Sequence, residues 1–160
     1  MPALALVPRE RVSVQESVIG DVFHLVAKLR AADRAEIEAL GIEPRFALRK
    51  NFRSAILRKT YIVDGEIAAM SGLCGEMMGD IGRPYLLTTP AAERVPVAFI
   101  KHARAAVVEM LRHKLRLEGY VAADYLGACR MLEMVGFTLG KPEPFGSRGA
   151  LFRSFTLVRD

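Results

Sequence analysis

The side chains whose chemistry is easiest to interpret are basic ones, which gather in two segments of this chain of 160 residues and net charge +5. Residues 44–59 contain no acidic residue, and residues 94–116 contain only Glu109. Clusters of this kind can contact phosphates, either of a nucleic acid or of a nucleotide cofactor. A solvated helix face is the alternative interpretation. The two groups are Arg45, Arg49, Lys50, Arg53, Arg58 and Lys59, and Arg94, Lys101, Arg104, Arg112, Lys114 and Arg116.

Side chains that usually carry metal or nucleophilic chemistry are few and scattered. His24, His102 and His113 do not stand at metal-ligand spacing with cysteines or carboxylates, so we expect no metal site. Cys74 and Cys129 have no neighbouring histidine that would indicate a nucleophile, and their number and spacing favour a reducing compartment. Neither a Ser-His-Asp set nor a phosphate-binding glycine loop is visible.

The elements that must position these residues alternate between strands and helices. Asp64-Gly65 is a strong signal for a two-residue hairpin, Gly41 is a natural helix end, and Pro44 can open a helix. We expect strands around Val12 and Val14, at 58–63, 66–74, 84–89, 120–123 and 152–158, and after residue 137. We expect helices at 21–30, 33–40, from 44, at 96–112 and at 126–135.

Two faces of these elements are also predicted. The helix that opens at Pro44 and the segment after it should turn Phe46, Ala47, Ala55, Ile56 and Leu57 inward. Strand 66–74 should place alternate residues on one face, namely Ile67, Ala69, Ser71 and Leu73.

The order of elements predicts an α/β (α+β) fold with a mixed, mainly antiparallel central sheet and helices on both faces. Strands joined by tight turns pair antiparallel, whereas strands joined through helices are usually parallel. The length suits one domain, expected over residues 11–160, after an apolar arm at 1–10. The arm is short and broken by prolines, so we interpret it as a docking segment rather than a signal peptide. No apolar run approaches the ~18–20 residues of a membrane span, so we expect no membrane partner.

The final third of the chain carries a family resemblance. Ala128, Gly136 and Phe137 have the spacing of the closing motif of GCN5-related N-acetyltransferases, in which it runs roughly Asn-x-x-Ala-x-x-x-Tyr-x-x-x-Gly-Phe. Tyr125 takes the Asn position and Leu132 the Tyr position. The shared residues are packing residues, whereas the replaced ones carry chemistry in the family. The resemblance therefore implies the acetyltransferase fold more directly than the reaction.

The resemblance also implies where a cofactor and an acid or base would lie. The family holds the pyrophosphate of acetyl-CoA at a helix N-terminus, here after Arg94 and Val95 and around Val97 and Ala98. The family's glycine position falls on Val97, and Pro96 removes one N–H. The resemblance thus leaves acetyl-CoA a candidate cofactor whose phosphate site is weakened at Pro96 and Val97.

Two residues are candidates for the acid and the base of the transfer. Leu132, at the family's tyrosine position, cannot donate a proton to the leaving thiolate. Tyr125 is the candidate substitute, and a half-buried structural tyrosine is the alternative. Glu76 is the candidate general base, and a solvated surface glutamate is the alternative.

Within the superfamily, the chain resembles a narrower group, the internal virion protein A family of short-tailed bacteriophages. The similar segments are 21–34, 98–104, 130–137 and 143–146. This resemblance implies a protein made in a host bacterial cytoplasm and then associated with the virion. Its expected partners are other phage virion proteins or copies of itself.

Three functions follow. The first is a structural or assembly protein of the virion on an acetyltransferase-like fold, with catalysis lost or vestigial. The alternative is an acetyl-CoA-dependent N-acetyltransferase acting on a protein or a small amine. A further alternative is an internal virion protein that contacts DNA weakly through its basic faces.

Overall fold

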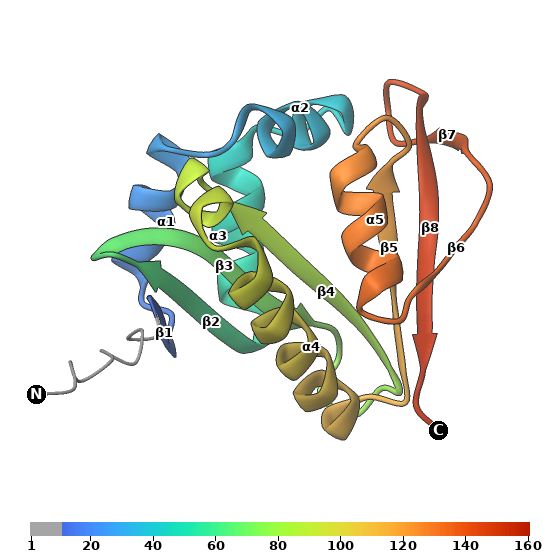
Figure 1. The fold of residues 1–160 in the computed structure, drawn as a ribbon. Coiled ribbons are helices and arrows are strands. Elements are labelled where there is room, and N and C mark those ends of the chain that lie inside the picture. Colours follow the sequence, from blue (N-terminus) through green and yellow to red (C-terminus); the bar gives the residue numbers. More distant parts are fainter. Residues whose placement is uncertain (1–10) are drawn as a thin grey trace, which may run out of the picture.

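The computed structural model describes residues 11–160, and the apolar arm predicted at 1–10 lies outside the described residues. The strands are β1 (Val12–Glu16), β2 (Ala55–Val63), β3 (Glu66–Cys74), β4 (Ile81–Thr88), β5 (Arg116–Ala122), β6 (Thr138–Leu139), β7 (Glu143–Phe145) and β8 (Ala150–Val158). They form one sheet in the order β1-β2-β3-β4-β5-β8-β6, with β7 also paired to β8 (Figure 1). β4 and β5 are parallel, and the other pairs are antiparallel. The predicted mixed, mainly antiparallel sheet is confirmed.

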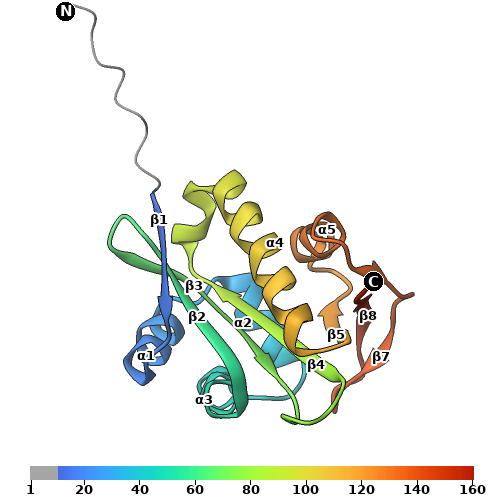
Figure 2. The same cartoon turned by 90° about the horizontal axis from the view of Figure 1, so that it is seen from below.

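Helices cover both faces of this sheet, as predicted (Figure 2). They are α1 (Ile19–Ala27), α2 (Ala31–Ala39), α3 (Pro44–Ser54), the short 3₁₀ helix η1 (Pro90–Arg94), α4 (Pro96–His113) and α5 (Leu126–Met134). On one face, α1 buries Val22 and Leu25, α2 buries Ile37 and α3 buries Leu48 against the sheet. On the other face, Phe99 of α4 and Cys129 of α5 belong to two further apolar clusters. The core is therefore divided by the sheet.

Local sequence cues place several element ends where they were predicted. Asp64 and Gly65 both have positive φ, 49° and 80°, as the two central residues of a tight hairpin turn require. Gly41 follows α2 with φ 78°, and Pro44 is the first residue of α3. The strand expected at 120–123 begins earlier, at Arg116, because β5 pairs with β8 along its whole length.

Two predicted side-chain directions are wrong. Phe46 is 62% exposed, because Pro44 and Leu48 occupy the buried stripe of α3 and Phe46 lies roughly half a turn away. Ile67 packs against the α1–α3 cluster, whereas Ala69 faces the α4 side. The reason is a β-bulge: Ile62 pairs with Ile67 and Tyr61 with Ala69, which leaves Ala68 as an extra residue that reverses the alternation.

No helix within residues 11–160 is long and apolar enough to cross a membrane.

Candidate active site

The parallel strands β4 and β5 separate soon after they begin. They pair at Ile81 with Arg116 and at Gly82 with Leu117, and beyond these positions they diverge (Figure 1). The opening belongs to a cleft of about 870 Å³. Side chains of α4 and α5 line it on one face of the sheet, and side chains of α2 and α3 line it on the other. A molecule can therefore reach the same strand edges from either face.

The narrow end of the cleft is held by a buried lysine. Lys114 is 1% exposed, and its Nζ donates to the backbone oxygens of Glu76 and, at 2.5 Å, of Gly79. Its side chain crosses Gly82 so closely that a Cβ there would lie 2.9 Å from Lys114 Cγ. Lys114 thus ties the loop between β3 and β4 to the start of β5.

The edge of β4 that faces the opening keeps one backbone donor. Along a strand, the backbone N–H and C=O groups of alternate residues point to opposite edges. Gly82 pairs with β5, and Thr88 donates its N–H to Asp33 and accepts from the Arg30 N–H through its C=O. The backbone groups of the even-numbered residues of β4 therefore point away from β3. Pro84 has no N–H, and Thr88 donates to Asp33 at 2.9 Å. Within β4, this leaves the N–H of Leu86 without a strand partner. The edge can therefore pair with an extended polar chain.

The wide end of the opening is bridged by two carboxylates of α2. Asp33 and Glu36 are three residues apart, so they lie on one face of the helix. Asp33 Oδ2 accepts from the Thr88 N–H of β4, and Glu36 Oε2 accepts from the Ala122 N–H of β5, each at 2.9 Å. The last residue of each separated strand therefore donates its N–H to a carboxylate of α2.

Burial sets the electrostatics of this pair. It raises the pKa of the Asp33 carboxyl, and hydrogen bonds from Thr88 and Tyr125 oppose that rise. Burial also raises the pKa of Glu36 to about 7, with a smaller contribution from the negative charges of Asp33 and Asp124. The hydrogen bond from Ala122 acts in the opposite direction. Glu36 therefore titrates near neutral pH.

Tyr125 and Glu76, the acid and base candidates from the sequence, both line the cleft. Tyr125 is the residue before α5, and its hydroxyl donates to Asp33. Burial, and next the charge of Asp33, raise the pKa of the Tyr125 phenol. Glu76 lies in the loop after β3, exposed to solvent. The cleft thus brings both candidates to its walls, but in very different surroundings.

The four residues expected at the cofactor phosphates lie between the end of η1 and the first turn of α4, and none of them is in the lining of the cleft within residues 11–160. Arg94 forms an ion pair with Glu66 at 3.2 Å. Val95 is buried in the core, and Ala98 packs against the same cluster. Val97 is 79% exposed. Their function at a phosphate stays a prediction.

Sequence reasoning missed Asp33 and Glu36. Their three-residue spacing on a predicted helix was readable, but nothing local indicates which strands that helix would approach. Glu36 contacts a backbone group 86 residues away, and Asp33 one 55 residues away.

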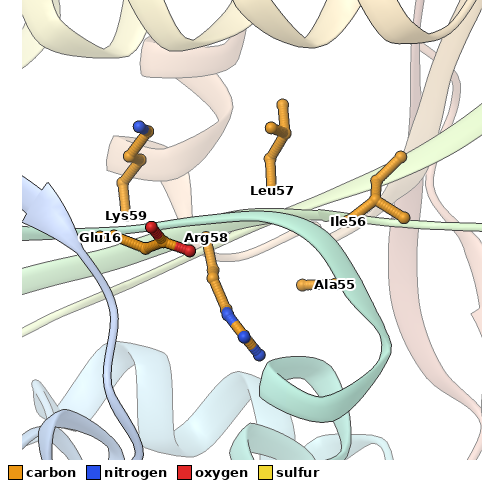
Figure 3. Close-up of a pocket in the computed structure, with 6 residues that line it drawn as sticks. All are labelled: Glu16, Ala55, Ile56, Leu57, Arg58 and Lys59. Carbon is orange, nitrogen blue, oxygen red and sulfur yellow. The ribbon is translucent and has the colours of Figure 1, made fainter.

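A second, smaller hollow of about 220 Å³ lies where β1 meets β2 and is lined by Glu16 and residues 55–59. Figure 3 shows Arg58 on the opposite side of the strand from Leu57 and Lys59. Arg58 already donates to the Phe52 carbonyl at 2.9 Å and lies 4.3 Å from the centre of the Phe52 ring. Among the residues that the structure describes, Arg58 is the one cation on that side of the hollow; it is committed to the fold, and we do not assign chemistry to the hollow.

In the described part of the chain, no group of three or more His, Cys, Asp or Glu side chains is arranged to hold a metal ion.

No family model matches the chain, and no curated protein matches it in sequence. Solved structures do match its fold. An N-acetyltransferase from Staphylococcus aureus Mu50 aligns with a TM-score of 0.68 at 11% identity, over 93% of this chain and 99% of that one. A spermidine N-acetyltransferase from Vibrio cholerae, in complex with CoA and spermine, aligns with a TM-score of 0.67 at 12% identity, over 92% and 95%. The ribosomal-protein-S18-alanine N-acetyltransferase from Escherichia coli aligns with a TM-score of 0.64 at 14% identity, over 92% and 93%.

These matches cover nearly the whole of each chain. Sequence identities this low show a shared fold and nothing more. Together with the splayed β4 and β5 and the helices on both faces, they establish that the chain has the fold of the GCN5-related N-acetyltransferases.

Proposed function

We propose that the chain is an acetyl-CoA-dependent N-acetyltransferase acting on a protein or a small amine. The observation that carries the proposal is the cleft between β4 and β5, which opens to both faces of the sheet. An acyl donor on the α4–α5 side and an amine on the α2–α3 side would meet at the same strand edges. This arrangement holds two reactants together, as group transfer requires.

The residues present fit acetyl-CoA in part. The free N–H of Leu86 and the apolar walls of α4 and α5 suit an extended arm that carries amide groups. At the phosphate end, Pro96 supplies no N–H, while the first turn of α4 still presents the N–H groups of Val97 and Ala98. The Val97 side chain points into solvent rather than over this turn. When bound, acetyl-CoA would supply the acetyl group as a thioester.

Transfer also needs a proton acceptor for the amine and a proton for the leaving thiolate. Tyr125 is our candidate for the acid, because it lines the cleft at the end of β5. Its proton is held by Asp33, so release of the phenol proton would require this hydrogen bond to break. Replacement Tyr125→Phe is therefore expected to slow turnover without changing acetyl-CoA affinity.

The decisive experiment is calorimetric titration of the full chain with acetyl-CoA and, separately, with CoA. Thiol release would then be followed with spermidine and with a short peptide that has a free N-terminal amine. Micromolar to sub-millimolar binding and acceptor-dependent thiol release are expected. Lack of acetyl-CoA binding at millimolar concentration would contradict the proposal.

DNA contact is a second candidate function, and one feature of α3 favours it. Arg45, Arg49 and Arg53 lie four residues apart and are exposed, and they form no ion pair within the described residues. The other basic segment is less available, because Lys114 is buried and Arg94 pairs with Glu66. The arginine row of α3 suits a row of phosphates.

A salt titration tests this contact. If it forms, the affinity for a short DNA duplex falls steeply with salt, and the triple replacement of these arginines by serine lowers that slope by about three, roughly one for each lost phosphate contact. Replacement of Lys101, Arg104 and Arg112 on α4 is the matched control. Equal slopes for wild type and the α3 variant would refute DNA contact through this face.

The resemblance to internal virion protein A of short-tailed bacteriophages stays a prediction, with the host cytoplasm, the virion and other virion proteins or copies of itself as expected locations and partners. A virion protein with this cleft could also transfer acetyl groups, so the two proposals are compatible. Mass spectrometry of purified phage particles tests the location. Consistent absence from particles would contradict a structural function there.

A further inference from the structure

The carboxyl group of Glu36 differs from the other carboxylates around the cleft. Asp33 already has three donors, because it accepts from the Thr88 N–H, the Thr88 hydroxyl and the Tyr125 hydroxyl. Glu93 is paired with Arg30 at 3.2 Å, and Glu76 is exposed to solvent. Glu36 Oε2 accepts from the Ala122 N–H, while Oε1 has no hydrogen bond among the described residues.

The position of Glu36 is equally specific. It lines the cleft from α2, on the face opposite α4 and α5, and it is held at the edge of β5 where the strands are far apart. The hydrogen bond from Ala122 fixes the carboxyl group and leaves one oxygen to receive a proton. A group with this geometry lies on the side from which the acceptor would enter.

The charges around Glu36 come from several elements. Asp33 on α2 and Asp124 after β5 are negative. Lys50 of α3 lines the same cleft, and Arg153 of β8 lies near Cys129, which also feels the charge of Glu36. The Arg153 Nε donates to the Gly140 carbonyl at 2.8 Å. Burial dominates this balance and places the pKa of Glu36 at about 7, which suits a base that works near neutral pH.

We propose that Glu36 is the general base that deprotonates the acceptor amine, an inference that rests on the proposed acetyl transfer. The acceptor is then a primary amine that arrives as its ammonium ion. One ammonium proton passes to Glu36 Oε1 and from there to water. The amine nitrogen forms a C–N bond with the thioester carbonyl carbon, the C–S bond breaks, and the second N–H proton ends on the sulfur as the thiol.

The variant Glu36→Gln tests the proposal, because its amide oxygen can still accept from Ala122 while it cannot take a proton. Spermidine and the amine-terminated peptide serve as acceptors. We expect kcat/KM to fall by about 10²-fold or more and the acidic limb of its pH profile, centred near pH 7, to disappear. The acetyl-CoA Kd should be unchanged. Glu38→Gln, an exposed position on the same helix, is the matched control and should behave as wild type.

A second readout does not depend on turnover. In the unliganded protein, ¹³C NMR of the side-chain carboxyls should show one resonance with a midpoint near pH 7 that Glu36→Gln removes. A Glu36 midpoint in the ordinary glutamate range would overturn the inference. So would a Glu36→Gln variant that keeps kcat/KM within about threefold of wild type and keeps the acidic limb. Wild type that neither binds acetyl-CoA nor acetylates either acceptor would instead overturn the proposed function, and this inference with it.

Discussion

The N–H of Leu86 offers a direct way to test whether the β4 edge binds an extended ligand. The replacement Leu86→Pro removes this backbone donor and no other. Because the Leu86 N–H points away from β3, the β3–β4 ladder loses no hydrogen bond. Leu86→Ala is the matched control, since it shortens the same half-buried side chain and keeps the N–H.

The expected magnitude follows from one lost hydrogen bond. A neutral hydrogen bond contributes about 0.5–1.5 kcal/mol net, which corresponds to a roughly 2- to 13-fold rise in the acetyl-CoA Kd. Calorimetry on Leu86→Pro and Leu86→Ala at one pH measures the difference. Equal Kd values for the two variants, with both folded, would refute the assignment of Leu86 to ligand binding. Leu87→Pro checks that alternate backbone N–H groups of β4 point toward β3. The Leu87 N–H points toward β3, so Leu87→Pro removes a hydrogen bond of the β3–β4 ladder and should lower the thermal midpoint far more than Leu86→Pro does.

Three stability predictions follow. Because burial raises the folded-state pKa of Glu36 from 4.5 to about 7, its contribution is fully present below about pH 4.5 and is lost as pH rises to about 7. Denaturant unfolding should show wild type losing up to about 3 kcal/mol relative to Glu36→Gln over that range, and parallel pH curves would contradict it. Lys114→Met should cost about 2 kcal/mol, because two loop carbonyls lose their donor, and an unchanged midpoint would refute this. Gly72→Ala should cost about 1–3 kcal/mol, because its Cβ would lie 2.5 Å from Tyr85 Cζ, whereas Gly20→Ala, with open space around it, should be neutral or stabilising; equal effects would contradict the packing argument.

Much of the fold was predictable because its cues are local. The turn at Asp64-Gly65, the helix end at Gly41 and the helix start at Pro44 depend on the φ preferences of one or two residues. The spacing of Ala128, Gly136 and Phe137 indicated the helix and strand that close the fold, and Phe137 is buried against Phe155. The two errors, Phe46 and Ile67, concern side-chain direction, which was decided by the stripe of α3 that packs on the core and by a β-bulge in the β2–β3 hairpin.

The candidate site was predictable only in part. Tyr125 was proposed from its place in the family motif and Glu76 from its place after strand 66–74; both line the cleft, and their catalytic functions stay predictions. Asp33 and Glu36 were missed because their partners, Thr88 and Ala122, belong to strands far along the sequence. The pKa of a carboxylate departs from its usual value only when burial, nearby charges or hydrogen bonds act on it. A helix pattern in the sequence shows neither the burial nor the partner.

The sequence by itself thus determined the order of elements, the hairpin, the helix ends and the packing residues of the last third, since each depends on nearby residues. Only the tertiary structure decided that β4 and β5 separate after Gly82, that α2 closes the wide end, and that Glu36 is partly buried with one oxygen unpaired. These features arise from long-range packing. The free-energy cost of burying a polar group depends on all the neighbouring segments that exclude water from it, and these segments come from distant parts of the sequence.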